Sequence, residues 1–139
     1  MSAAKEAFVE RVVKGGCLCG AVRYEAAAAM KSTYCHCRTC QRSAGAPVMA
    51  WIGVPAAAFA YVSGEPRIFH SSPRAQREFC GACGTQLVFR EHGDANVDIS
   101  TASLDDPAQA PPQYHIWRMS RIGWFEIDDD LPRHEAARR

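Results

Sequence analysis

The chain has 139 residues, a formal net charge of +1 at pH 7 and a hydrophobic content of 47%. A chain of this size forms one domain with a hydrophobic core of its own. Its basic residues are dispersed along the sequence, which argues against a nucleic-acid-binding surface. Charges at Lys5, Glu6, Glu10 and Arg11 interrupt the start of the chain, so it does not read as a signal peptide.

A long stretch of low charge, residues 43–61, contains two glycines and two prolines. Such a stretch is unsuited to a transmembrane helix. We therefore expect a cytoplasmic protein with neither a membrane nor a nucleic acid as partner. In a reducing compartment, clustered cysteines are more often metal ligands than disulfides. Nothing in the sequence indicates an oligomeric state.

Taken in chain order, the sequence reads as short strands between turns. The N-terminal segment, residues 1–13, is expected to be frayed or to begin the first strand. Runs of β-favouring residues, separated by glycines and prolines, predict seven strands: 21–25, 48–54, 67–70, 86–90, 97–100, 115–117 and 124–127. Pro47 limits any helix after the central cysteines to about two turns, and one more turn is expected at 56–59. These features predict a single all-β domain of antiparallel sheets with at most short helices, frayed before about Val12 and after about His134.

All seven cysteines fall into three clusters, Cys17-Leu18-Cys19, Cys35-His36-Cys37-Arg38-Thr39-Cys40 and Cys80-Gly81-Ala82-Cys83. A structural zinc site takes four protein ligands, whereas a zinc site that does chemistry takes three and keeps one position open. Seven cysteines match one site of each kind.

The first and third clusters are expected to share the site with four ligands. Cys80 and Cys83 have the spacing of a tight turn that directs two sulfurs at one ion, and a glycine follows them. Cys17 and Cys19 are expected on an extended segment, where both sulfurs point to one side. The alternatives are disulfides or free buried thiols, and the paired spacing favours zinc.

The central cluster supplies three ligands, Cys35, Cys37 and Cys40, within six residues. Three thiolates on Zn²⁺ leave a net charge of −1 and one open position, which suits an incoming thiol held as its thiolate. His36 is a candidate fourth ligand. On an extended segment, however, its ring projects to the opposite face, and the alternative is a hydrogen-bonded polar residue. Ser43 is expected to cap a short helix that begins after the cluster.

Three motifs carry a family resemblance: GCLCGAVRY at residues 16–24, CHCRTCQRSAGA at 35–46 and FCGACGTQL at 79–87. Together they resemble the glutathione-dependent formaldehyde-activating enzyme family, also called the CENP-V/GFA domain. The likeness spans residues 14–135 and leaves a C-terminal tail at 136–139.

The resemblance implies a β-tent fold of antiparallel sheets with zinc-binding knuckles. It also implies two zinc sites: a structural zinc on Cys17, Cys19, Cys80 and Cys83, and a catalytic-type zinc on Cys35, Cys37 and Cys40. The open site with three thiolates is expected to lose its ion, or to be oxidised, more easily than the closed one.

The activity of that family is the condensation of formaldehyde with glutathione to S-(hydroxymethyl)glutathione, classed in the reverse sense as a carbon–sulfur lyase reaction. The resemblance therefore implies a zinc enzyme that condenses or cleaves an adduct between an aldehyde and glutathione or another small thiol. Two alternatives stay open, because they need the same cysteines: a non-catalytic, zinc-stabilised binding module, and a metal-handling or redox protein.

Other residues near the central motif are candidates for substrate binding and proton transfer. Arg38 and Arg42 are suited to a peptide carboxylate, because a guanidinium group binds it through two hydrogen bonds; the alternative is solvent-exposed charge. His115 is a candidate proton donor, and Trp117, two residues on along an expected strand, shares its face as a candidate substrate-binding residue. The alternatives are a hydrogen-bonded structural histidine and a core tryptophan. Residues 128–130, three aspartates, are expected to form a solvated turn.

Overall fold

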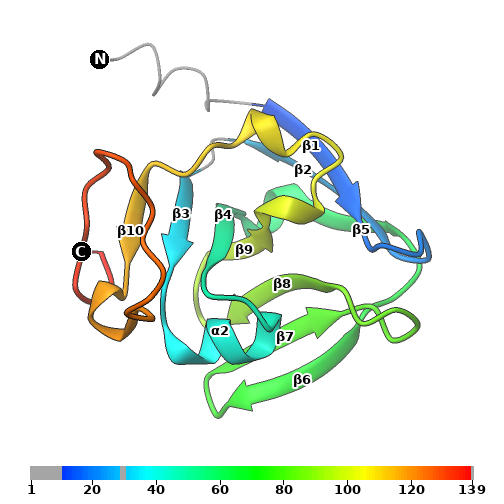
Figure 1. Ribbon diagram of the computed structural model, residues 1–139. Helices are drawn as coiled ribbons and strands as arrows, with labels where there is room; N and C mark the ends of the chain where they lie inside the picture. Colours follow the sequence, from blue (N-terminus) through cyan, green and yellow to red (C-terminus); the bar gives the residue numbers. More distant parts are fainter. Residues whose placement is uncertain (1–10, 29–30, 139) are drawn as a thin grey trace.

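The computed structural model describes residues 11–28 and 31–138, and in these residues ten strands form two sheets (Figure 1). The smaller sheet has the order β1-β2-β5 and the larger β10-β3-β4-β9-β8-β7-β6. The strands are β1 (Arg11–Gly16), β2 (Arg23–Ala28), β3 (Lys31–Cys35), β4 (Met49–Pro55), β5 (Phe59–Ser63), β6 (Arg67–Ser72), β7 (Ala75–Phe79), β8 (Gln86–Glu91), β9 (Asn96–Ser100) and β10 (Tyr114–Ile116). All neighbours pair antiparallel except β10 and β3, which pair in parallel.

Helical structure is short in the described part of the chain, as expected for an all-β domain. The α-helix α2 (Arg38–Ala44) follows β3 directly. Four single 3₁₀ turns complete the set: η1 (Ala56–Ala58), η2 (Thr101–Ser103), η3 (Pro107–Gln109) and η4 (Arg118–Ser120). Among the described residues, no helix is long and apolar enough to cross a membrane.

Most of the predicted strands are present. Those predicted at 48–54, 67–70, 86–90, 97–100 and 115–117 correspond to β4, β6, β8, β9 and β10, and the one at 21–25 is displaced towards residue 28 as β2. The strand predicted at 124–127 was wrong. That segment is irregular: Phe125 closes a turn by donating to the carbonyl oxygen of Ile122, and Glu126 forms ion pairs with Arg118 and Arg133 instead of joining a sheet. Of the expected N-terminal segment, residues 1–10 lie outside the described residues, and residue 139 of the expected tail does as well.

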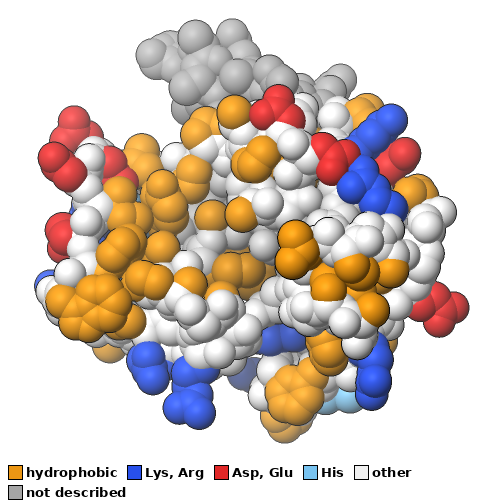
Figure 2. Space-filling model, turned by 45° about the vertical axis from the view of Figure 1, so that its right-hand side comes forward, with side chains coloured by type: hydrophobic (Ala, Val, Ile, Leu, Met, Phe, Trp, Pro, Cys, Tyr) orange, Lys and Arg blue, Asp and Glu red, His pale blue; other side chains and the backbone are white. Residues whose placement is uncertain are grey.

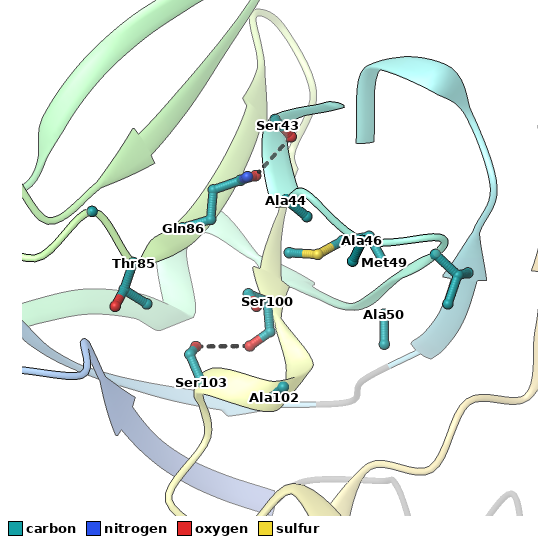
Figure 3. Close-up of a pocket in the computed structure, with 12 residues that line it drawn as sticks. Ser43, Ala44, Ala46, Met49, Ala50, Thr85, Gln86, Ser100, Ala102 and Ser103 are labelled. Carbon is teal, nitrogen blue, oxygen red and sulfur yellow. Dashed lines mark hydrogen bonds between the residues drawn. The ribbon is translucent and has the colours of Figure 1, made fainter. Parts of the chain in front are cut away.

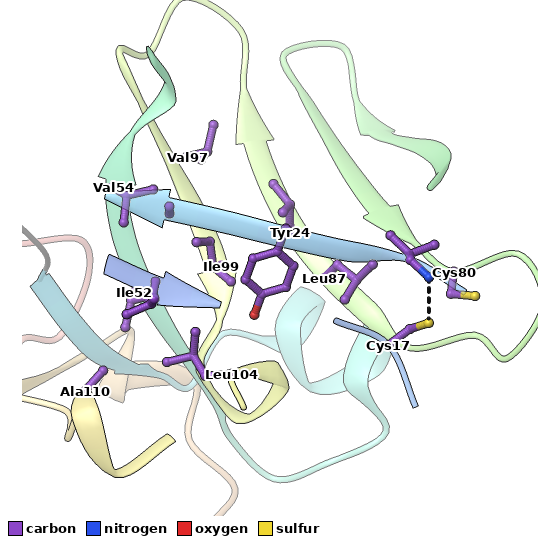
Figure 4. Packing of buried hydrophobic residues seen from close by; sticks show 14 residues of the cluster. Cys17, Tyr24, Ile52, Val54, Cys80, Leu87, Val97, Ile99, Leu104 and Ala110 are labelled. Atoms are coloured by element: carbon purple, nitrogen blue, oxygen red, sulfur yellow. Dashed lines mark hydrogen bonds between the residues drawn. The ribbon is translucent and has the colours of Figure 1, made fainter. Parts of the chain in front are cut away.

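The main hydrophobic core lies between the two sheets (Figure 4). Val13 and Tyr24 enter it from the smaller sheet, and Ile52, Leu87 and Ile99 enter it from the larger one, all with at most 1% of their surface exposed. The Tyr24 hydroxyl stays satisfied inside this core because it lies 2.6 Å from Ser103 Oγ. Cys17 and Cys80 close one end of the same cluster.

A second, smaller cluster packs on the opposite face of the larger sheet. It consists of Cys35, Cys40, Met49 and Trp51, with Phe89 and Trp117 against it. Because successive residues of a strand face opposite ways, Trp51 joins this cluster while its neighbour Ile52 joins the main core. Strand β4 thus separates the two hydrophobic clusters.

The carboxyl group of Asp98, on the larger sheet, is only partly exposed. Asp98 on β9 pairs with Gly53 on β4 and with Phe89 on β8. Its burial, helped by the nearby charge of Asp94, raises the pKa of Asp98 to about 7. The folded state therefore favours the protonated carboxyl group.

We predict that gly-to-ala changes will distinguish crowded from open backbone positions. A Cβ added at Gly15 would overlap the Tyr24 hydroxyl and the carbonyl oxygen of Ser103, whereas one at Gly123 would meet nothing within 4 Å. Gly15→Ala should therefore lower the free energy of unfolding by about 1–3 kcal/mol, and Gly123→Ala should change it by less than about 0.5 kcal/mol. Urea unfolding of both variants measures this, and equal losses would contradict the packing described for Tyr24.

A second prediction concerns pH. Because the folded-state pKa of Asp98 is raised, its contribution to stability is complete below about pH 4 and is lost as the pH rises through about 7. Asp98→Asn removes this titration. The melting temperature of the variant minus that of the wild type should therefore increase from about pH 4 to about pH 7 and stay level above that. The exposed Asp128→Asn serves as the control, and a difference for Asp98→Asn that is independent of pH would refute the shift.

Candidate metal centres

The four cysteines of the first and third motifs converge, although about sixty residues separate the two pairs. Their ligand atoms all lie within 4.8 Å of one another. The sulfurs of Cys17 and Cys19 are 3.6 Å apart, and those of Cys19 and Cys80 are 3.8 Å apart. Sulfurs at the corners of a tetrahedron with Zn–S bonds of about 2.3 Å lie about 3.8 Å apart. This cluster therefore fits a closed, four-coordinate zinc ion.

Two similar turns present these sulfurs. In the turn before β8, the Gly84 amide donates to the carbonyl oxygen of Cys80 at 2.8 Å, and Gly84 has a φ of +83°. In the turn after β1, the Gly20 amide donates to the carbonyl oxygen of Cys17 at 3.1 Å, again with a φ of +83°. Glycine is suited to both positions, because other residues rarely adopt this left-handed backbone. The expectation of an extended segment at Cys17–Cys19 was therefore wrong: the segment is a turn.

Backbone amides and one hydroxyl group support the sulfurs. The amides of Val22 and Ala82 donate to the sulfurs of Cys17 and Cys80, at 3.2 and 3.4 Å. Such donors stabilise a thiolate. Thr85 joins the two turns, because its Oγ1 accepts from the Leu18 amide at 3.0 Å and lies 3.2 Å from the Cys83 sulfur. Sequence reasoning had not singled out Thr85.

The three cysteines of the central motif form the second cluster, on the other face of the larger sheet. Cys35 ends β3, Cys37 precedes α2 and Cys40 lies in its first turn, and their sulfurs are within 4.8 Å of one another. The Cys40 amide donates to the Cys37 sulfur at 3.3 Å, so Cys37 is the N-cap of α2. The expectation that Ser43 caps a helix after the cluster was wrong, because the helix begins inside the cluster and Ser43 lies in its last turn.

A buried guanidinium group faces this second cluster. Arg77 on β7 is 7% exposed, and its Nη2 lies 3.7 Å from the Cys40 sulfur. The group packs over the Phe89 ring, at 4.9 Å from the centroid, and lies 6.0 Å from the centroid of the Trp51 ring. No carboxylate of the described residues forms an ion pair with it. Because a buried charge is costly without a counter-charge, Arg77 indicates that the neighbouring sulfurs carry negative charge.

The ionisation of the three thiols leads to the same conclusion. Hydrogen bonds from the Cys35 and Cys40 thiols, together with the charge of Arg77, lower the pKa of the Cys37 thiol. The hydrogen bonds and charges of Cys37 and Cys40, together with burial, raise the pKa of the Cys35 thiol. Three adjacent sulfurs therefore cannot all ionise unless a cation neutralises them. Since thiolates are ligands for soft divalent ions, the donor set fits zinc.

His36 lies between two of these cysteines in sequence, but its side chain belongs to a hydrogen-bonded chain of polar groups and not to the metal site. It is not part of either candidate cluster in the described residues. Its Nε2 lies 2.8 Å from Nδ1 of His115, both side chains are buried, and burial lowers the pKa of His36 to about 4. Its Nδ1 has no partner among the described residues.

The chain of polar groups continues from His115 to the surface. His115 Nε2 lies 3.0 Å from Asp129, and the Arg133 guanidinium donates to the same carboxylate at 2.8 Å. Although burial opposes the shift, the bonds from Arg133 and His115 lower the pKa of Asp129 to about 2. The expectation of a solvated turn at residues 128–130 was wrong for Asp129, whose carboxylate is hydrogen-bonded to His115 and so anchors this segment to β10.

The other candidate residues differ in how exposed their side chains are. Trp117 packs against the cluster and is the single non-glycine residue with positive φ, +59°, in the described chain. A left-handed backbone costs such a residue about 1–3 kcal/mol, and such strain is concentrated at functional sites. Arg38 donates to the Gln41 side chain, and Arg42 is exposed on α2. Trp124 is 77% exposed.

A pocket of about 530 Å³ is lined by residues that adjoin each of the two clusters (Figure 3). Thr85, which contacts the Cys83 sulfur, lines one side, and Ser43 and Ala44, on the helix that carries Cys40, line another. The start of β4 and the turn η2 complete the wall, and the lining includes no charged side chain. In the view of Figure 2, hydrophobic and uncharged side chains likewise occupy the centre of the face, with charged ones around its rim.

The two clusters should respond differently to the loss of one sulfur. Cys80→Ser removes a ligand from the closed cluster within the core, so it should abolish one bound zinc and lower stability severely, because zinc binding there is coupled to folding. Cys37→Ser should abolish the other zinc and leave a protein that melts cooperatively. Metal counting and thermal melting test this. If Cys37→Ser melts as badly as Cys80→Ser, both ions hold the fold.

Comparisons with known proteins show which family the chain belongs to. The family model described as "Glutathione-dependent formaldehyde-activating enzyme" matches residues 12–120, a range that includes all seven cysteines. The crystal structure of a Rhodobacter sphaeroides protein is similar in fold, with a TM-score of 0.56 and 22% sequence identity over 66% of this chain and 87% of that one. No curated protein matches the chain. Since the family model covers well over half of the residues, the chain belongs to the glutathione-dependent formaldehyde-activating enzyme family.

Proposed function

We propose that the protein is a carbon–sulfur lyase-type enzyme that acts on an adduct between formaldehyde, or another small aldehyde, and a small thiol such as glutathione. The observation that carries this proposal is the cluster of Cys35, Cys37 and Cys40, which offers three ligands beside a pocket and faces the buried charge of Arg77. The cluster of four cysteines has the role of a structural zinc site in this proposal. Thiol chemistry of this kind needs a compartment in which thiols stay reduced, so the cytoplasm is the proposed location.

The proposed reaction joins a thiol and a carbonyl group. The S–C bond forms, the π electrons of C=O move to oxygen, and the proton lost by the thiol ends on that oxygen; cleavage is the reverse. Zinc on three cysteines would supply a cation that favours the thiolate form of the substrate. Arg77 compensates the excess negative charge of the sulfurs, and Trp117 forms a wall beside them.

The remaining candidate residues have less direct parts in the proposal. Arg38 and Arg42 lie four residues apart on the exposed side of α2, where they are available to the carboxylates of a peptide thiol. His115 is fully buried, so it is proposed to act on the proton balance only through His36 and Asp129, which are its hydrogen-bond partners.

One observation favours the alternative of a non-catalytic, zinc-stabilised module. The bonds from His36 to His115 and on to Asp129 fasten the C-terminal segment to the turn that carries the three cysteines. In that case the second metal serves to anchor this segment. Ligand binding distinguishes the two functions.

We predict that zinc-loaded protein binds glutathione at least about tenfold more tightly than S-methylglutathione, because the methylated sulfur cannot become a thiolate. Cys37→Ser, with zinc still bound at the closed cluster, should lose this preference. Calorimetry with both ligands measures it, and Arg74→Ala, an exposed arginine outside the pocket, is the control. Equal affinities for the two ligands in the wild type would contradict thiolate capture and favour the binding module.

A further inference from the structure

Three hydrogen-bonded side chains meet at one end of the pocket. The Arg77 guanidinium donates from Nη1 to Ser43 Oγ at 3.0 Å and to Gln86 Oε1 at 3.3 Å. Ser43 Oγ and Gln86 Oε1 are themselves 3.2 Å apart (Figure 3). Ser43 and Gln86 line the pocket, while Arg77 lies buried behind them.

This contact decides which way the amide group of Gln86 points. A guanidinium group has only donors, so the group of Gln86 that faces Arg77 has to be its oxygen. The amide nitrogen is then directed away from Arg77. Its two N–H groups have no acceptor among the described residues, and Gln86 is partly exposed to the pocket. The pocket therefore contains two oriented donors with nothing in the described chain to receive them.

The same guanidinium group also contacts the three-cysteine cluster. Its Nη2 lies 3.7 Å from the Cys40 sulfur, and its Nη1 is bonded to Gln86. The Arg77 guanidinium group thus contacts both the Gln86 amide and the sulfur of Cys40. The other pocket residues add hydroxyl groups, on Thr85 and Ser103 among others, but no charge. This lining suits an uncharged oxygen rather than a carboxylate or a phosphate.

We propose that Gln86 is a substrate-binding residue whose amide N–H groups bind the aldehyde oxygen, or the hydroxyl oxygen of the thiol adduct. The proposal rests on the proposed function, because it places this oxygen beside a sulfur at the three-cysteine site. As the S–C bond forms, the carbonyl oxygen gains negative charge before it takes up the thiol proton. Donors already aimed at that position stabilise the charge without having to reorganise.

The test uses two stable ligands that differ by one hydroxyl group, S-(2-hydroxyethyl)glutathione and S-ethylglutathione. The zinc-loaded wild type should bind the hydroxyl-bearing ligand about fivefold to tenfold more tightly, the usual effect of one hydrogen bond. Gln86→Leu has a similar size but no donor, and its ratio should fall to about one. Gln86→Met keeps the length of the side chain and also has no N–H donor, so the preference should be lost as well.

Controls separate this inference from the function on which it rests. Gln109→Leu changes a glutamine outside the pocket and should keep the wild-type ratio. Melting temperature and zinc content establish that each variant is folded, and Gln86→Met serves if Gln86→Leu does not fold. A wild-type ratio retained in a folded Gln86 variant overturns the role of Gln86, even if glutathione binds normally. If the wild type binds neither glutathione nor the two thioethers, the proposed function and the role of Gln86 fail together. If it binds glutathione but shows no preference between the two thioethers, only the role of Gln86 fails.

Discussion

The convergence of four sulfurs from two distant turns is the constraint on which the rest of the structure depends. Cys17 and Cys19 lie between two strands of the smaller sheet, and Cys80 and Cys83 lie between β7 and β8 of the larger one. A metal ion bound to these sulfurs would join the sheets at one end of their shared core. Because such a site does not exist in the unfolded chain, the free energy of metal binding would contribute directly to folding. The hydrophobic core then fills the space between the two sheets, next to the four sulfurs.

Strand β4 separates the second cluster from the main core. Its residues alternate between the two faces of the larger sheet, so that Ile52 packs in the main core and Trp51 packs beside the three cysteines. The closed cluster can therefore carry the stability of the fold while the open one lies next to a pocket. Thr85 and Ser43 link the two, because each lies close to one cluster and also lines that pocket.

Charge is the organising property of the open cluster. Three adjacent sulfurs need compensation beyond a single divalent ion, and Arg77 supplies it from within the sheet. The guanidinium group has a second effect, since its fixed donors also determine the orientation of the Gln86 amide. One buried side chain thus connects the electrostatics of the sulfurs to the polar end of the pocket. The aromatic rings of Trp51 and Phe89 exclude water from this contact and so strengthen it.

The sequence by itself determined the features that depend on spacing along the chain. The intervals between the cysteines predict two groups of ligands, and the runs of β-favouring residues predict an all-β domain; the structure agrees with both. These inferences succeed because a metal knuckle and a strand are local structures. The strand predicted at 124–127 failed for the opposite reason, since this segment is held by the ion pairs of Glu126 with Arg118 and Arg133 and not by a neighbouring strand.

The tertiary structure alone decided which distant polar side chains meet. Strand β7 was not predicted, because its sequence AQREF places two charged residues, Arg77 and Glu78, where a buried strand usually has apolar ones. Each is buried because a partner from elsewhere in the fold compensates it: the sulfur of Cys40 for Arg77, and Arg90 for Glu78. The bond between His36 and His115 likewise depends on the parallel pairing of β3 with β10, seventy-nine residues apart in sequence. Such contacts leave no periodic signal in the sequence, because the free energy of burying a charge depends on what lies opposite it and not on its neighbours along the chain.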